Sequence, residues 1–414
     1  MQRITLLILL LLCLPDVCIY LLHIRKLTGK RGLRLLYGVP TAVLLTGYFI
    51  LWLHSGENTL AHHATSIGWL AIGILLFALP KLLFLLCSLT GILLHACLHR
   101  IPRLPFTLAG VALAIVCALG ILYGSLVDVH RLQVKEVEFH SPDLPTSFDG
   151  YRLVQLSDLH LGSWSHRPYT IEKLVERVNG LHPRLIVFTG DLVNQRSCEL
   201  EPFVPILQRL NAPDGVYSVL GNHDYGTYYH WPTPEAEQEN LHHLCALQET
   251  MGWHLLNNAH VVLHQGSDRM ALVGVENEGE PPFSQHGDLP RALQGTDGLF
   301  KILLSHNPTH WRREVLPESD VQLTLSGHTH AMQCILFGHS LASLKYPEWH
   351  GFHYAQQRAL YVNIGIGYVG LPFRFNARPE ITVITLRREA NKAGVPEADT
   401  PAHIPSTEPT AYLR

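Results

Sequence analysis

Five short segments of the sequence carry side chains of the kinds that bind divalent metals. They combine carboxylate, amide oxygen and imidazole nitrogen, a mixture that suits hard and borderline divalent cations. In extended backbone, alternate residues point the same way, so a pair such as Asp158 and His160 can face one centre. The segments are Ser157-Asp158-Leu159-His160, Thr189-Gly190-Asp191, Gly221-Asn222-His223-Asp224, Ser305-His306-Asn307-Pro308 and Ser326-Gly327-His328-Thr329-His330.

Each segment alone is weak evidence for a site. Gly-Asp is usually part of a turn, and Asp-x-His is common in loops of every kind. Gly-Asn-His-Asp is the most specific of the five. Their value lies in their order and context, because every one of them directly follows a short apolar run.

Those apolar runs predict buried strands. Runs of this length, rich in Val, Ile and Leu and bounded by Gly, Asn, Asp or Pro, are typical of strands. Segments at helical spacing lie between some of them, at 171–178, 203–210 and 235–251, which predicts an α/β fold. Ligands bind at the carboxyl ends of strands in open α/β sheets, so the five segments should meet at one edge. The expected strands are 153–156, 185–188, 216–220, 271–275, 301–304, 321–325, 359–364 and 381–386, the last two without a long helix between them and therefore expected to be antiparallel.

The first part of the chain has a different composition. Apolar runs at 4–22, 35–53, 67–98 and 106–127 are long enough to cross a membrane as helices, for which roughly 20 apolar residues are needed. The third run contains Pro80 and is predicted to be one long kinked span, with a span plus an interfacial turn as the alternative. The first run resembles a signal peptide, but no small-residue cleavage site follows it, so an uncleaved span is favoured.

The predicted organisation is therefore a membrane region followed by a soluble domain. We expect four transmembrane helices within residues 1–128, a linker at 129–150, a catalytic domain at 151–388 and a disordered tail at 389–414. Lys and Arg gather in the loops after the first and third spans, and such loops stay in the cytoplasm. The N-terminus and the soluble domain should then both lie on the extracytoplasmic side of the cell membrane.

Charge and histidine content narrow the class of ligand. The net charge is -3, with 31 Lys and Arg against 34 Asp and Glu, so no basic excess exists to bind nucleic acid. The 27 histidines are many for this length, and neutral imidazole is a common metal ligand.

With these motifs the chain resembles the calcineurin-like metallophosphoesterase superfamily, in particular its membrane-anchored bacterial members. The resemblance covers about residues 151–387 and implies a four-layer α/β/β/α sandwich, preceded here by an all-α transmembrane region. It also implies two divalent metal ions, with Mn placed first and Fe, Zn or Mg as alternatives. Two such ions can stabilise the attacking and leaving oxygens, and a metal-bound hydroxide becomes available near neutral pH.

The resemblance also implies a role for each site residue. His223 would be the catalytic acid, Asp224 would orient it, and Asp191 would bridge both metals. The first metal would be held by Asp158, His160 and His330, and the second by Asn222, His306 and His328.

Two positions stand apart from that pattern. Family members commonly follow Gly-His-Thr-His with Gly-Gly-Gln, whereas this chain has Ala331-Met332-Gln333. The change could narrow the backbone beside the metals or reshape access for the substrate. Arg374 is expected at the surface, with binding of a phosphate as the alternative.

The leading hypothesis is a membrane-anchored hydrolase of a phosphomonoester, phosphodiester or pyrophosphate. Its location suggests a lipid-linked substrate. Some relatives cleave the pyrophosphate of a nucleotide-linked acylated sugar in lipid A synthesis, but that reaction is cytoplasmic and the loop charges argue against it. The alternative is a non-enzymatic metal sensor or transporter that retains the phosphoesterase scaffold. The spans carry few charges, chiefly Asp16 and Lys81, so a polar transport path is not evident.

Overall fold

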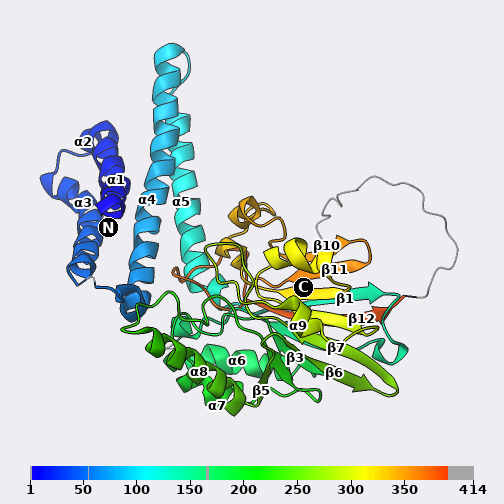
Figure 1. Cartoon of the computed structure of the whole chain (residues 1–414). Helices are drawn as coiled ribbons and strands as arrows, with labels where there is room; N and C mark the ends of the chain where they lie inside the picture. The colour runs from blue at the N-terminus through cyan, green and yellow to red at the C-terminus, as the bar shows by residue number, and fades with distance from the viewer. Residues whose placement is uncertain (1, 55, 165–166, 390–414) are drawn as a thin grey trace.

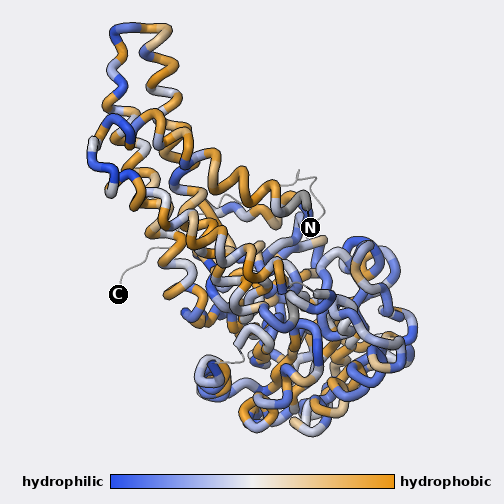
Figure 2. The backbone as a smooth tube through the Cα atoms, turned by 90° about the vertical axis from the view of Figure 1, so that its left-hand side faces the viewer, coloured by the Kyte–Doolittle hydropathy of each residue, from blue (hydrophilic) through white to orange (hydrophobic). Residues whose placement is uncertain are grey.

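The computed structural model describes residues 2–54, 56–164 and 167–389, and it divides into long apolar helices and a two-sheet domain (Figure 1). Helices of this length and composition form four candidate membrane spans. Figure 2 shows apolar residues along the helices and hydrophilic turns at the end farthest from the domain. The helices are α1 (Gln2–Ile19), extended by a π-helical turn and α2 (Arg25–Leu27), then α3 (Arg31–Leu53), α4 (Thr59–Cys97) and α5 (Leu104–Leu126).

The long third apolar run forms one helix. Helix α4 has 39 residues and includes Pro80 in its interior, so the run forms a single candidate span. Its start lies beside the catalytic domain, because the side chain of Asn58 exchanges hydrogen bonds of 3.0 and 2.7 Å with the backbone of His230. The hydroxyl of Thr5 also lies 2.7 Å from that of Tyr48, near the end of α3. The N-terminal end of α1 is therefore on the same side as the domain.

A pair of opposite charges lies inside the helical bundle. The ammonium group of Lys81 on α4 lies 2.5 Å from the carboxylate of Asp16 on α1. Hydroxyl groups of Tyr37 and Thr41 on α3 donate hydrogen bonds to the same carboxylate. Because charges in a bilayer are costly unless paired, this cluster holds three helices together.

The domain contains two six-stranded mixed sheets that pack face to face. The first has the strand order β1-β12-β2-β3-β4-β5 and the second β10-β11-β9-β8-β7-β6. The strands of the first sheet are β1 (Gln133–Ser141), β12 (Glu380–Arg388), β2 (Arg152–Leu156), β3 (Leu185–Phe188), β4 (Val216–Ser218) and β5 (Trp253–Leu255). Those of the second are β10 (Gly351–Ala355), β11 (Arg358–Val362), β9 (Leu323–Ser326), β8 (Phe300–Leu304), β7 (Asp268–Gly274) and β6 (Ala259–Gln265).

Helices cover the outer face of each sheet, which confirms the four-layer α/β/β/α sandwich. One apolar core lies between the sheets and includes Leu153, Leu272 and Leu325. A second core lies under α6 (Pro168–Asn179), α7 (Val204–Leu207) and α8 (Pro234–Thr250). A third lies under α9 (Leu289–Leu293) and the turn before α10 (Leu316–Glu318). Both faces of each sheet are buried, which explains why the central strands are continuous apolar runs rather than alternating ones.

The structure differs from the sequence expectations in two places. Residues 133–141, expected within a linker, form β1, which pairs in parallel with β12 along its whole length. The last two strands are not antiparallel neighbours. Strand β11 joins the second sheet in parallel with β9, while β12 joins the first sheet antiparallel to β2. Of the expected disordered tail, residues 390–414 lie outside the described residues.

Candidate metal centre

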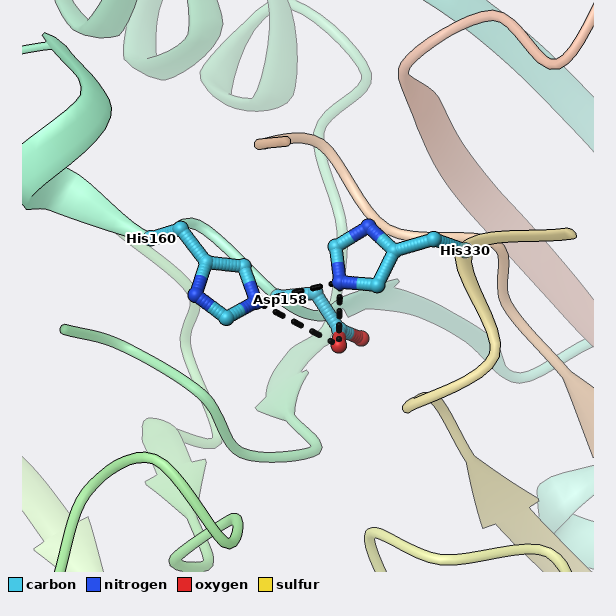
Figure 3. Close-up of side chains that lie close together, drawn as sticks. All are labelled: Asp158, His160 and His330. Carbon is cyan, nitrogen blue, oxygen red and sulfur yellow. Dashed lines mark hydrogen bonds and ion pairs between the residues drawn. The ribbon is translucent and has the colours of Figure 1, made fainter. Parts of the chain in front are cut away.

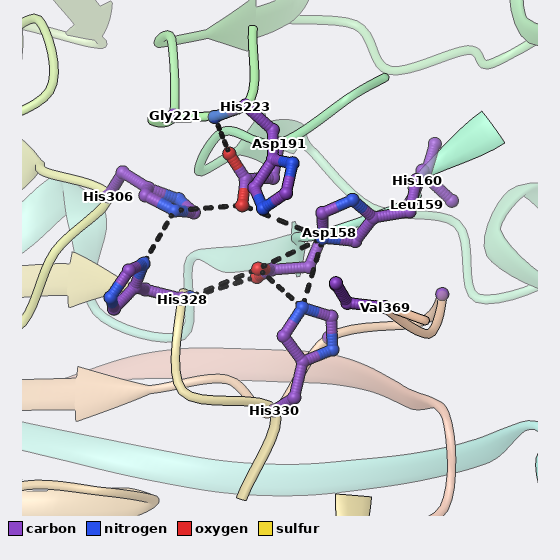
Figure 4. A network of polar contacts seen from close by, with 12 residues as sticks. Asp158, Leu159, His160, Asp191, Gly221, His223, His306, His328, His330 and Val369 are labelled. Atoms are coloured by element: carbon purple, nitrogen blue, oxygen red, sulfur yellow. Dashed lines mark hydrogen bonds and ion pairs between the residues drawn. The ribbon is translucent and has the colours of Figure 1, made fainter. Parts of the chain in front are cut away.

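The predicted metal residues meet at one edge of the sandwich. Asp158 and His160 follow β2, Asp191 follows β3, and Asn222 and His223 follow β4. From the second sheet, His306 follows β8, and His328 and His330 follow β9. Figure 4 shows the side chains of all of these residues except Asn222, which is not labelled there, pointing toward one another from both sheets. The carboxyl ends of parallel strands thus bring five separate loops to one place.

Asp158, His160 and His330 form a first group of possible ligands (Figure 3). The Nε2 atoms of the two histidines are 3.0 Å apart. His330 Nε2 lies 3.1 Å and His160 Nε2 3.9 Å from the same carboxylate oxygen of Asp158. All three residues are buried, so their polar atoms face one another rather than water.

Asp191, His306 and His328 form a second group. The Oδ2 atom of Asp191 lies 3.2 Å from His306 Nε2, and that nitrogen lies 3.3 Å from His328 Nδ1. The same Oδ2 atom is 3.5 Å from His160 Nε2 of the first group. Asp191 therefore stands between the two groups, as a bridging carboxylate would.

The donor set of the second group fits a divalent cation. His306 Nδ1 lies 2.7 Å from the carbonyl oxygen of Thr189, to which it can only donate, so Nε2 is the atom that faces Asp191. Burial lowers the pKa of His306, but the Asp191 carboxylate offsets this and the pKa rises to about 9. A proton on Nε2 thus compensates the carboxylate in the metal-free protein, and a metal ion would replace it.

Asn222 also fits a ligand role. Its amide nitrogen donates to the hydroxyl of Tyr228 at 2.9 Å, which fixes the orientation of the amide. The amide oxygen is buried and has no hydrogen-bond partner. A buried oxygen without a partner is costly. A cation bound to it would remove that cost.

Electrostatics in the metal-free site follow from burial and mutual attraction. Burial raises the pKa of the Asp158 carboxyl, but His330 beside it lowers the pKa by more, and the net value falls below the usual range. Asp191 behaves in the same way, chiefly because of His306. Burial lowers the pKa of His328 to about 3 and that of His160 well below its ordinary value. The two carboxyls are therefore charged at neutral pH, and these two imidazoles are neutral, as metal binding requires.

Backbone strain is concentrated at the ligands. Five of the seven predicted metal residues have a positive φ, namely Asp158 (53°), His160 (48°), Asp191 (60°), His328 (73°) and His330 (48°). This region is unfavourable for residues with a Cβ, by roughly 1–3 kcal/mol each. Interloop hydrogen bonds hold the strained conformations, for example from the Asp158 N–H to the carbonyl of Gly190 at 2.9 Å.

Two glycines permit the close approach of these loops. Gly190 has a φ of 96°, and a Cβ there would lie 2.6 Å from the backbone nitrogen of Gly221. A Cβ at Gly327 would collide with Ser157 and the carboxylate of Asp158. Only glycine therefore allows the loops after β3 and β9 to reach the centre.

The structure corrects the expected partner of His223. The His223 ring nitrogen Nδ1 lies 2.7 Å from the carbonyl oxygen of Asn194, which therefore orients the ring. Both carboxylate oxygens of Asp224 instead accept backbone hydrogen bonds, from the N–H groups of Asp191, Leu192, Val193 and Gly221. Asp224 thus ties the loop after β4 to the loop that carries Asp191, and it acts on His223 only through the backbone.

Arg374 is buried, so the expectation of a surface position is wrong. Its side chain is fully inaccessible and donates to the carbonyls of Gly367, Ala377 and Ile364 at 2.8, 2.8 and 3.1 Å. Its Nη2 also lies 3.0 Å from His330 Nδ1. Arginine can only donate, so this ring nitrogen accepts. In the neutral ring the proton is then on Nε2, and a metal at Nε2 would have to displace it.

The unusual Ala331-Met332 pair adopts the conformation that glycine favours. Ala331 has a φ of 50° and Met332 a φ of 46°, and both lie in the left-handed region. Ala331 is buried, whereas the side chain of Met332 is 57% exposed. The replacement of Gly-Gly by Ala331-Met332 therefore adds strain to the backbone of this turn.

Tyr346, Asn194 and Tyr228 belong to the site but have no motif of their own. The hydroxyl of Tyr346 lies 2.9 Å from His328 Nε2, which leaves Nδ1 to face His306. Tyr346 comes from the loop before β10, far from the five segments, and no sequence signal marked it. Asn194 lies three residues after Asp191, so one of the five segments indicates its neighbourhood.

Comparisons with known proteins agree with this geometry. Residues 151–332 match the family described as calcineurin-like phosphoesterase, and residues 2–128 match a probable calcineurin-like phosphoesterase transmembrane domain. A Bacillus subtilis protein, the uncharacterized metallophosphoesterase YkuE, is 32% identical over 281 residues, which are 65% of this chain and 90% of that protein. The chain belongs to the calcineurin-like phosphoesterase family. It is a metallophosphoesterase, a hydrolase that acts on phosphoester bonds.

Other relatives combine the same domain with a membrane region or a known substrate. A Danio rerio transmembrane protein with metallophosphoesterase domain is 34% identical over 284 residues, 66% of this chain and 62% of that protein. The present chain thus spans less than two thirds of that relative's length. The UDP-2,3-diacylglucosamine pyrophosphatase LpxG of Chlamydia muridarum is 27% identical over 314 residues, 64% of this chain and 92% of that protein.

Proposed function

We propose that the protein hydrolyses a phosphomonoester, phosphodiester or pyrophosphate through a dinuclear metal centre. The observation that carries this proposal is the position of Asp191, which faces His160 of one ligand group and His306 of the other. A shared carboxylate between two groups of donor side chains suits two adjacent cations.

The first metal would be held by Asp158, His160 and His330, and the second by Asn222, His306 and His328, with Asp191 between them. When bound, the two ions would supply Lewis-acid activation of water and neutralise charge on the phosphate. We expect the bound metal to be Mn, with Fe, Zn and Mg as alternatives. The residues themselves contribute fixed orientations, set by Thr189, Tyr228 and Tyr346 behind three of the ligands.

His223 would deliver a proton to the leaving oxygen. Its Nδ1 atom donates to the Asn194 carbonyl, so Nε2 is the nitrogen turned toward His160 and Asp191. Histidine is the side chain that most often serves as a general acid in enzymes. Asp224 supports this step indirectly, because it fixes the loop on which His223 lies.

The decisive experiment is hydrolysis by the purified full-length protein. After chelation, the protein is reloaded separately with Mn, Fe, Zn, Mg or Ca and tested on a panel of phosphomonoesters, phosphodiesters and pyrophosphates. Asp191→Ala and His223→Ala should each lower kcat at least about 100-fold. The exposed residues Asp297 and His264 provide matched alanine controls, which should keep full activity.

The same variants test the competing function. If Asp191→Ala and His223→Ala hydrolyse every active substrate as fast as the wild type, the centre is not catalytic. A metal sensor or transporter on a phosphoesterase scaffold would then be the better account.

We further propose that the catalytic domain lies on the extracytoplasmic side. Helix α2 and the start of α3 lie at the end of the bundle away from the domain (Figure 1), since α3 ends at Leu53, shortly before Asn58 contacts the domain. These helix ends carry the basic residues Arg25, Lys26, Arg31 and Arg34. Basic loops stay in the cytoplasm. A fluorescent protein that matures only in the cytoplasm, fused to the C-terminus, should remain dark, and a periplasmic alkaline phosphatase reporter should be active. The reverse result would place the domain inside.

A further inference from the structure

A cavity separates the predicted catalytic histidine from the membrane region. It encloses about 720 Å³, including the space at its open mouth. One wall is α4, which contributes Ile67 and Trp69, and the opposite wall is the loop that contains Tyr368, Val369 and Pro372.

The inner end of this cavity is polar and reaches the catalytic centre. His223, Asn194 and Ser163 line it there, and Asn194 is the residue that orients the His223 ring. None of the described residues that line the cavity is Lys, Arg, Asp or Glu. The cavity thus runs from uncharged polar groups beside His223 to an apolar wall on α4. That polarity fits a ligand with a polar end and a hydrocarbon end.

Helix α4 is fixed against the catalytic domain at this point. A Cβ on Gly68 would lie 2.6 Å from the carbonyl oxygen of Gly370 and 2.9 Å from the ring of Pro372, so the helix backbone contacts the loop directly. On the neighbouring α5, Gly124 packs against Phe373, and its carbonyl accepts a hydrogen bond of 3.2 Å from the Arg374 N–H. The loop from Gly370 to Arg374 therefore lies between His330 and the helices α4 and α5.

The membrane connection continues just beyond α5. The carboxylate of the fully buried Asp128 accepts from the Asn376 N–H at 2.8 Å and from Arg378 Nε at 2.9 Å. These contacts fix the height of the catalytic centre above the bilayer. The cavity cannot move away from the membrane unless they break.

The apolar wall lies near the domain end of the candidate membrane span in α4. Helix α4 is about 58 Å long at 1.5 Å per residue, whereas the hydrocarbon core is about 30 Å thick. Ile67 and Trp69 lie within the apolar span, near its domain end. Trp69 is 37% exposed, and tryptophan favours the interface between lipid and water. A chain that leaves the bilayer along α4 would meet the cavity first.

We propose that this cavity binds the hydrocarbon chain of a lipid-linked phosphoester, which enters from the membrane along α4 while its phosphate lies at the metal centre. The inference rests on the proposed phosphoesterase function and specifies its substrate class. The parts of such a substrate match the parts of the site in order. The hydrocarbon chain would lie against the apolar wall, the polar linkage at the polar inner end, and the phosphate at the ligand groups.

A chain-length series of ligands tests the proposal by binding. Ethyl, octyl and hexadecyl phosphate are titrated against the Mn-loaded full-length protein in detergent micelles, with displacement of a fluorescent phosphate ligand as readout. Each fully buried methylene should raise affinity about fourfold. Octyl phosphate has six more methylenes than ethyl phosphate, so burial of about four of them should make it bind about 250-fold more tightly.

Variants on both walls separate cavity binding from uptake into micelles. Val369→Asp, on the loop, should lower the octyl-to-ethyl affinity ratio at least about tenfold, and Trp69→Ala on α4 should lower it in the same direction. Phe337→Asp is the matched control, because Phe337 is 98% exposed and outside the cavity. The octyl-to-ethyl affinity ratio of Phe337→Asp should equal that of the wild type, because partitioning of the ligands into micelles is the same for every variant.

Photolabelling gives a second readout that does not depend on affinity. An octyl phosphate that carries a diazirine at the chain end should label residues 67–69 and 368–372, and hexadecyl phosphate should compete with it. The proposal is overturned if affinity does not rise with chain length, if Val369→Asp and Phe337→Asp keep the same ratio, or if labelling avoids both walls. Failure of the proposed function is separate, since it would appear as no hydrolysis of any ester with any metal.

Discussion

Replacement of Arg374 by methionine should destabilise the catalytic domain. Methionine keeps much of the apolar volume but removes the charge and all donors. Three buried carbonyls, at Gly367, Ala377 and Ile364, would then lose their partners. Each unsatisfied buried group costs about 1–3 kcal/mol, so the gross loss is about 3–9 kcal/mol.

Part of that loss is offset. Burial lowers the pKa of Arg374 to about 10, which shows that the charged form is itself poorly solvated in the folded protein. Removing a buried charge returns several kcal/mol of desolvation free energy. We therefore expect a net decrease in the free energy of unfolding of about 3 kcal/mol.

Urea unfolding of the full-length protein in detergent provides the assay. Tryptophan fluorescence reports unfolding of the catalytic domain, in which Trp164, Trp253 and Trp311 are buried. The control is Arg269→Met at an exposed position on β7, for which we expect less than about 0.5 kcal/mol. If Arg374→Met unfolds at the same urea concentration as the control, the hydrogen bonds of the buried guanidinium do not stabilise the domain and the reasoning is refuted.

Three further predictions concern other parts of the chain. Lys81→Met should lower the midpoint of thermal unfolding, because Asp16 is left as an unpaired charge among the helices. Adding Asp16→Leu to the same protein should restore most of the lost midpoint temperature. Equal midpoints for the single and the double variant would contradict the pairing. Met332→Gly should raise the free energy of unfolding by about 1 kcal/mol by relieving the left-handed backbone, as urea titration would show, and a loss of stability would refute the strain. Metal binding should release at least one proton below pH 9, because the pKa of His306 is raised from 6.5 to about 9 in the metal-free protein and the ring must deprotonate to bind. Calorimetry in buffers of different ionisation enthalpy measures this release, and affinity should rise as pH approaches 9; a pH-independent affinity would contradict it.

Local patterns in the sequence were sufficient to predict the candidate spans, most of the strands and the residues that cluster at the candidate metal centre. A span or a buried strand is a property of a few neighbouring residues, because it depends on how much apolar surface they must remove from water. The segments around Asp158, Asp191 and His328 were recognisable because each combines a ligand with the end of such a strand. Their convergence followed from the general rule for α/β sheets.

Partner choice was decided only by the tertiary structure. Residues 133–141 alternate too weakly to be recognised as a strand, and β1 forms because β12 offers a free edge. Hydrogen-bonding partners are equally non-local. Arg374 is an ordinary charged residue in the sequence, and its burial depends on the carbonyls of Ile364, Gly367 and Ala377, which the folded loop places around it. Asp224 differs from its expected role for the same reason.

The position of the catalytic centre relative to the membrane is the clearest such case. The sequence established a membrane region and a metal site as separate features, since each is encoded in its own segment. Their junction depends on contacts between residues hundreds of positions apart, such as Gly68 with Pro372 and Asp128 with Arg378. Close packing of a glycine against a loop leaves no periodic trace in the sequence. Only the folded chain therefore places the cavity between α4 and His223.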